Sequence, residues 1–152
     1  MTTRIISLLT IIVLITATAV FAATIFDGYE DLPWGTHLHK VMNAYPKGHL
    51  DEYNKEIIYT QDNPNETIAS RLFAFKKDKL SGVAVTFNAD YVKKSGLENL
   101  KQKYIKQYGK GNSGGQGSTH MISYVWENKN TRISFVYIPN RPEMTVLQFE
   151  QK

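Results

Sequence analysis

Residues 67–87, "TIASRLFAFKKDKLSGVAVTF", decide the predicted fold. The first part, residues 67–75, alternates with the period of two that a β-strand requires, which places Arg71, Phe73 and Phe75 on one face. The polar run "KKDK" indicates a hairpin turn, and residues 80–87 return with the same alternation. The stretch therefore predicts two antiparallel strands whose apolar face must be covered by a second layer of structure.

Further segments have the composition of strands. They are residues 56–61, 120–127, 131–138 and 144–150. The runs between strands, "DNPNE", "NKN" and "PNRP", are rich in turn-forming residues. Residues 49–56, "HLDEYNKE", are polar, and we expect them to form an ordinary loop.

Two segments carry the period of a helix. In the first, apolar residues recur at i, i+3, i+4 and i+7, namely Leu38, Val41, Met42 and Tyr45. Thr36 is placed to cap its first turn, and Pro46 marks its end. The second helix is predicted from about residue 91 to residue 108, with lysines on its polar side, and Gly109 ends it.

The order of these elements is helix, three strands, helix, three strands. We therefore predict an α+β fold of two α-β-β-β units, in which an antiparallel sheet carries two helices packed on one face. Residues 23–152 are long enough to form a single domain with its own core. A signal helix is predicted to precede this domain.

The N-terminus has the parts of a secretory signal peptide. Arg4 precedes an uncharged apolar run, Ile5 to Ala23, that ends in small residues. Cleavage after Ala22 is predicted, so that residues 1–22 are the signal peptide and the mature protein is periplasmic or secreted. The alternative is an uncleaved anchor, because the run of 19 residues is just long enough to cross a bilayer. The membrane is expected as a partner only through this segment.

The composition limits the partners that we expect. The chain has no cysteine, so neither disulfides nor a lipid-modified cysteine are predicted. Its net charge of +4 is mild, which predicts at most weak attraction to anionic lipids or cell-wall polymers, and no binding of nucleic acid. An envelope or secreted protein is the expected partner, and the sequence leaves the oligomeric state open.

No catalytic or metal-binding motif is complete in the sequence. His37 and His39 lie two residues apart, so on a helix they point in different directions and cannot share a metal ion. His49 and His120 are isolated in the sequence and would need a partner supplied by the fold. We predict no metal site and no enzymatic activity.

The loop at residues 109–117, "GKGNSGGQG", contains a G-x-G-x-x-G pattern. A dinucleotide-binding fingerprint follows a strand and opens a helix, whereas this pattern follows the predicted second helix and precedes a strand. The loop is therefore predicted to be a flexible connection, and no cofactor is expected.

Trp34 and a group of four aromatic strand residues each have two interpretations. Trp34 precedes the first helix, where it either packs back on the helix or forms an exposed platform for a ligand. The candidate ligand or partner contacts, if a sheet face stays uncovered, are Trp126, Tyr124, Tyr137 and Phe135. The alternative for these strand residues is a place in the core.

The stretches "DLPWGTHLHKVMNAYP" and "LFAFKKDKLSGVAVTF" resemble those of small exported bacterial proteins of unknown function. That group shares a Trp-Gly-Thr start of a short helix, matched here by Trp34, Gly35 and Thr36. It also shares an Asp-Lys-Leu-x-Gly-Val hairpin, here residues 78–83, and a helix ending in Tyr-Gly-Lys, here residues 108–110. More distantly, the chain resembles the β-lactamase-inhibitor-like and BamE-like architecture, which implies a binding or inhibitory role.

These features predict an exported binding or interaction protein of unknown ligand. A second hypothesis, implied by the inhibitor-like architecture, is an inhibitor of a secreted enzyme. A third is a small hydrolase that uses His49 or His120 with nearby carboxylates. A cavity joining one of these histidines to an acid would favour the hydrolase, and an uncovered sheet face bearing aromatic side chains would favour the binding protein.

Overall fold

The structure is a computed structural model that describes residues 24–114 and 120–152. The predicted signal peptide, residues 1–22, lies outside the described residues, as does part of the glycine-rich loop. Strands make up 53% of the structure and helices 21%. The protein is therefore mostly β.

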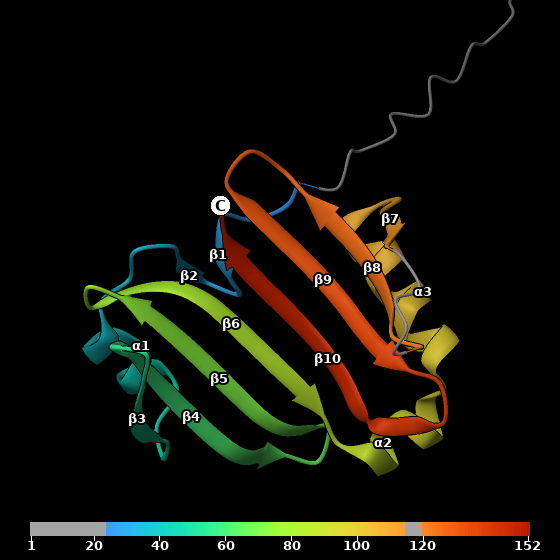
Figure 1. The fold of residues 1–152 in the computed structure, drawn as a ribbon, viewed down its shortest axis with the longest axis horizontal. Coiled ribbons are helices and arrows are strands. Elements are labelled where there is room, and N and C mark those ends of the chain that lie inside the picture. Colours follow the sequence, from blue (N-terminus) through green and yellow to red (C-terminus); the bar gives the residue numbers. More distant parts are fainter. Residues whose placement is uncertain (1–23, 115–119) are drawn as a thin grey trace, which may run out of the picture.

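Most strands belong to one antiparallel sheet, which within the described residues has eight strands in the order β3-β4-β5-β6-β10-β9-β8-β7 (Figure 1). Its first half consists of β3 (His49–Tyr53), β4 (Glu56–Asn65), β5 (Ile68–Lys76) and β6 (Lys79–Phe87). Its second half consists of β7 (Asn112–Gly114), β8 (Ile122–Glu127), β9 (Thr131–Ile138) and β10 (Arg141–Gln151). Because β10 returns to pair with β6, the two halves form one continuous sheet.

The helices of the described part of the chain lie over one face of this sheet (Figure 1). α1 (Leu38–Ala44) lies behind the first half, and α2 (Ala89–Ser95) and α3 (Leu97–Tyr108) lie behind the second half. A short ribbon of β1 (Gly28–Tyr29) and β2 (Leu32–Pro33) shares that face. Within the ranges that the structure describes, no helix has the length and apolar character that crossing a bilayer requires.

The predicted arrangement of two α-β-β-β units with two helices on one face is wrong. β3 forms in the segment expected to be a loop, and its five residues are all exposed, so no burial pattern marks it in the sequence. Gly96, with a φ of 80°, divides the expected second helix into α2 and α3. α1 is only seven residues long. The fold is instead a mostly β structure in which one large sheet carries small helices.

The hairpin of residues 67–87 is present as β5 and β6, and its register organises the core. Lys77 and Asp78 have φ angles of 51° and 64°, as the tight turn between twisted antiparallel strands requires. Side chains that face one another across neighbouring strands then form rows. One row consists of Tyr59, Phe73, Val83, Phe149, Ile133 and Trp126, and every member is buried.

The start of α1 is held by the β5–β6 hairpin. The backbone N–H of Gly35 donates to the carbonyl of Leu80 at 2.9 Å, and the N–H of Leu80 donates to the carbonyl of Thr36 at 2.9 Å. The prediction that Thr36 caps the helix is wrong, because its hydroxyl donates to the carbonyl of Pro33 at 2.7 Å. His37 occupies the cap position and makes no side-chain cap bond.

Candidate functional site

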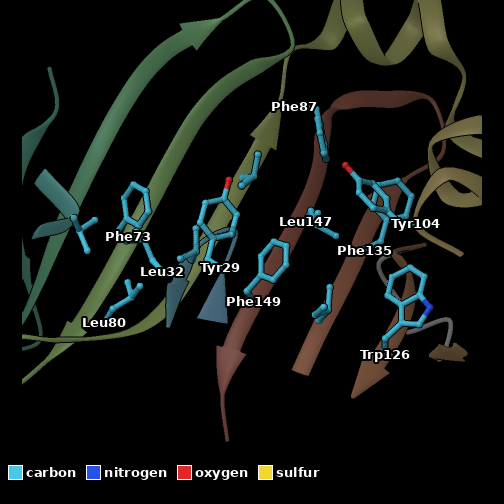
Figure 2. Packing of buried hydrophobic residues seen from close by; sticks show 14 of the residues in the cluster. Tyr29, Leu32, Phe73, Leu80, Phe87, Tyr104, Trp126, Phe135, Leu147 and Phe149 are labelled. Carbon is cyan, nitrogen blue, oxygen red and sulfur yellow. The ribbon is translucent and has the colours of Figure 1, made fainter. Parts of the chain in front are cut away.

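A cavity of about 230 Å³ lies on the helix-covered face of the sheet, between β1 and the inner side of α3. Its floor includes Leu147 and Phe149 of β10. Figure 2 shows Tyr29 and Tyr104 on opposite sides of these two residues. The cavity thus lies over the middle of the sheet, where β10 forms its floor and β1 and α3 form two of its sides.

Six aromatic rings line the cavity in an unbroken series, which we call the aromatic arc. In spatial order they are Tyr29, Phe149, Tyr108, Tyr104, Phe87 and Tyr91, and each ring centroid lies 5.0–6.5 Å from the next. Aromatic pairs at such distances stabilise one another. The arc therefore forms an apolar wall that is supported by its own contacts.

Tyr104 contributes a hydrogen-bonding group to this apolar wall. The residue is only 6% exposed, lines the cavity, and makes no side-chain hydrogen bond through its hydroxyl within the described part of the chain. Burial raises the pKa of Tyr104 well above its ordinary value, and it raises the pKa of Tyr108 to about 12. Both hydroxyls are therefore neutral at physiological pH.

The charged residues of the lining are Glu30 and Lys103, and both are exposed at its rim. The Glu30 carboxylate accepts a hydrogen bond from the Tyr45 hydroxyl at 2.5 Å. The Lys103 Nζ lies 5.6 Å from the centroid of the Tyr104 ring. Among the described residues neither group takes part in an ion pair, so the rim carries one charge of each sign.

A buried arginine lies behind Tyr29. Arg71 of β5 is 8% exposed, and its Nη1 donates to Gln61 at 3.0 Å. Its Cζ lies 4.7 Å from the ring centroid of Tyr45 and 5.8 Å from that of Tyr29. Its Nε has no partner within the described ranges. Because a buried cation is costly unless its surroundings compensate, the two ring faces and the amide are the groups that stabilise it.

The four aromatic candidates from the sequence lie together on the face beneath α3. The ring centroids of Tyr124 and Trp126 on β8 are 5.0 Å apart, and those of Phe135 and Tyr137 on β9 are 5.4 Å apart. Trp126 and Phe135 are buried, and the Trp126 indole N–H donates to the carbonyl of Gly109 at 2.8 Å. The lining of the cavity consists of other residues. A ligand or partner contact by these four stays a prediction.

Trp34 is part of the packed structure. Its ring is half-buried against the core, and its indole N–H donates to the hydroxyl of Thr131 at 2.8 Å. This arrangement favours the packing interpretation over an exposed platform.

The fold brings His49 close to two carboxylates. Its ring nitrogens lie 3.1 Å from Asp51 and 3.4 Å from Asp62, and all three side chains are more than half exposed. His120 is also exposed. The hydrolase hypothesis requires a deep cleft in which an acid and a histidine are shielded from water. These histidines instead lie on an exposed surface that water reaches.

His37 and His39 are exposed at the start of α1. The Nδ1 of His37 lies 2.9 Å from the Asp78 carboxylate, and the two histidine ring centroids are 6.1 Å apart. In the part of the chain that the structure describes, no three His, Asp or Glu side chains are arranged to hold a metal ion.

Sequence alone does not identify the cavity. Tyr104 and Tyr108 belong to the apolar side of the predicted second helix, where any core residue would also lie. Tyr29 lies 75 positions before Tyr104, in a segment for which neither a helix nor a strand is predicted. The signal that could have pointed to the site is the three tyrosines of residues 91–108, because a tyrosine at a core position brings a polar group with it.

No protein-family model and no curated protein matches the chain. Among solved structures, the chain is similar to YjgB, a DUF4309 family protein from Bacillus subtilis subsp. subtilis str. 168. The two are 18% identical, the match covers 77% of this chain and 79% of that chain, and the TM-score is 0.47. A likeness at this level assigns neither a family nor a function.

Proposed function

We propose that the protein is an exported binding protein, not an enzyme, that holds a small ligand against the aromatic arc. The observation that carries this proposal is the cavity itself. Ligand sites are concave and mostly apolar, with a small number of polar groups that orient the ligand. The arc supplies the apolar wall, and Tyr104, a buried residue of that lining, brings a hydroxyl group to it.

The chemistry of the lining favours binding over catalysis. Acid–base catalysis needs groups with a pKa near the working pH, whereas burial raises the pKa of Tyr104 and Tyr108 far from it. The hydrolase hypothesis has less support, because His49 and its two aspartates lie on the exposed surface of β3 and β4. An inhibitor of a secreted enzyme would require an exposed contact surface rather than this cavity.

Export is proposed from the apolar run Ile5 to Ala23, which follows Arg4. N-terminal sequencing of the protein recovered from the periplasm or medium tests it. A mature chain that begins at Ala23 is expected, because cleavage is predicted after Ala22. Recovery of the whole chain from the cytoplasm, still beginning at Met1, would contradict export.

A fragment screen read by NMR tests the binding proposal without assuming a ligand. The tyrosine rings are isotope-labelled, and the protein is titrated with uncharged, cationic and anionic fragments. We expect some fragments to shift the signals of Tyr29, Tyr104 and Tyr108 together. Tyr53, which is 71% exposed on β3, is the internal control and should not move. A screen in which no fragment shifts the three cavity tyrosines would contradict the proposal.

A further inference from the structure

The charges around the cavity select for neither a cation nor an anion. A cation against the arc would face Lys103 at the rim and Arg71 behind Tyr29. An anion would face Glu30, which also lines the cavity. Because a ligand of either sign also meets an opposite charge at the rim, attraction and repulsion offset each other. An uncharged ligand depends on neither.

The polar groups of the lining disfavour a purely apolar ligand. An apolar molecule would cover the Tyr104 hydroxyl without offering it a hydrogen-bond partner, and a buried polar group without a partner weakens binding. Thr67 and Gln107 add further polar side chains to the lining. A neutral tyrosine hydroxyl both donates and accepts, so a hydroxyl group on the ligand would satisfy it.

The aromatic arc favours a ligand that offers C–H groups to its rings, because burying apolar surface against aromatic side chains is favourable. A sugar ring has C–H groups on its faces and hydroxyl groups around its edge, so it combines the two requirements. The cavity volume of about 230 Å³ lies below the range of roughly 300–1,000 Å³ that is usual for drug-sized ligands. This size fits a single ring.

We propose that the cavity binds one uncharged sugar ring, with a C–H face against the aromatic arc and a hydroxyl group hydrogen-bonded to Tyr104. This inference rests on the proposed function, since it names the class of ligand for the same site. The sugar is free or is the terminal unit of a glycan, and both present the same ring to the cavity.

Titration with defined probes tests the ligand class. The probes are the methyl glycosides of glucose, galactose, mannose and N-acetylglucosamine, with tetramethylammonium and acetate as charged comparisons. We expect at least one glycoside to shift the Tyr104 ring signals along a saturable curve. We expect neither ion to do so.

Two substitutions separate the contribution of the Tyr104 hydroxyl to binding from that of its ring. Tyr104→Phe keeps the ring and should weaken glycoside binding about 3- to 10-fold, the effect of one lost hydrogen bond. Tyr104→Leu removes the ring as well and should reduce binding below detection, provided that its unfolding curve shows a folded protein. Tyr53→Phe, on the exposed edge strand, is the matched control and should bind as the unchanged protein does.

The outcomes distinguish this inference from the proposed function. Fragments that bind in the cavity while every glycoside fails would overturn the sugar proposal and leave the binding function standing. Saturable binding of tetramethylammonium at the arc would also overturn it. Glycoside binding that is unaffected by Tyr104→Phe would contradict the assigned hydrogen bond. Failure of all fragments and glycosides would remove both proposals.

Discussion

At the scale of single residues, Asp27 connects the N-terminal segment to the turn between β8 and β9. Its carboxylate accepts hydrogen bonds from Asn130 at 2.6 Å, from Asn128 at 2.9 Å and from Thr131 at 3.0 Å. The Thr131 hydroxyl in turn accepts a hydrogen bond from the indole N–H of Trp34 at 2.8 Å. These bonds join segments about a hundred positions apart, so they fix the N-terminal segment, and with it Tyr29, on the sheet.

We expect Asp27→Asn to destabilise the protein more at neutral pH than in acid. The hydrogen bonds, that from Asn130 first, hold the pKa of Asp27 below its ordinary value of 3.8 in the folded state. A carboxylate with a lowered folded-state pKa contributes stability above its unfolded pKa, and the contribution is lost as pH falls through the folded-state value. Urea unfolding at neutral pH and at about pH 2 measures the difference.

Asp31→Asn is the control for this experiment, since Asp31 is an exposed carboxylate of the same segment. It should change the urea midpoint little at either pH. An equal loss of stability for Asp27→Asn at both pH values would show that the charge of Asp27 is not what stabilises the turn.

At the scale of elements, the position of α1 depends on the backbone of Gly35. Its φ of 82° lies in the left-handed region, where a Cβ atom is unfavourable. We therefore expect Gly35→Ala to lower the free energy of unfolding by about 1 kcal/mol. Chemical denaturation measures this value.

Gly82→Ala is the matched control, because Gly82 in β6 lacks a positive φ and a Cβ there would lie 3.5 Å or more from its neighbours. Gly82→Ala should lower the free energy of unfolding by less than Gly35→Ala does. If the two substitutions lowered it equally, the backbone conformation at Gly35 would not determine how α1 is placed.

Strands in which apolar and polar residues alternate could be predicted from the sequence, and strands without this alternation could not. β5 and β6 follow from residues 67–87 because their apolar side chains recur at every second position. β3 has no such pattern, since it is an exposed edge strand held by backbone bonds to β4. The break at Gly96 was missed because the apolar period continues through it, from Val92 to Leu100.

At the scale of the whole molecule, the candidate site depends on tertiary structure. Tyr29 and Tyr104 line the same cavity because β10 joins the two halves into one sheet, with β1 and α3 both lying over its helix-covered face. No spacing in the sequence indicates that these two tyrosines lie close together in the fold. The sequence points to a core rich in aromatic residues, and only the fold shows which of them border a cavity.

We expect Ile68→Trp to fill the cavity. Ile68 is half-buried at the start of β5 and lines the cavity. A larger side chain there should leave stability unchanged or raise it by about 0.5–2 kcal/mol, as cavity-filling substitutions do, and should prevent ligand binding. Unfolding curves and the fragment titration measure the two effects.

Ile57→Trp on β4 is the control, because Ile57 is exposed and lies outside the lining of the cavity. It should leave fragment binding intact. Normal binding by Ile68→Trp, in a protein that folds as stably as the original, would place the ligand elsewhere.

A crystal structure of the protein soaked with the fragment or glycoside that binds best in solution tests the binding proposal most directly. We expect a ligand in contact with the aromatic arc and within hydrogen-bonding distance of the Tyr104 hydroxyl. A ligand on the opposite face of the sheet, in the shallow hollow around Ala74 and Gly82, with the cavity empty, would contradict it.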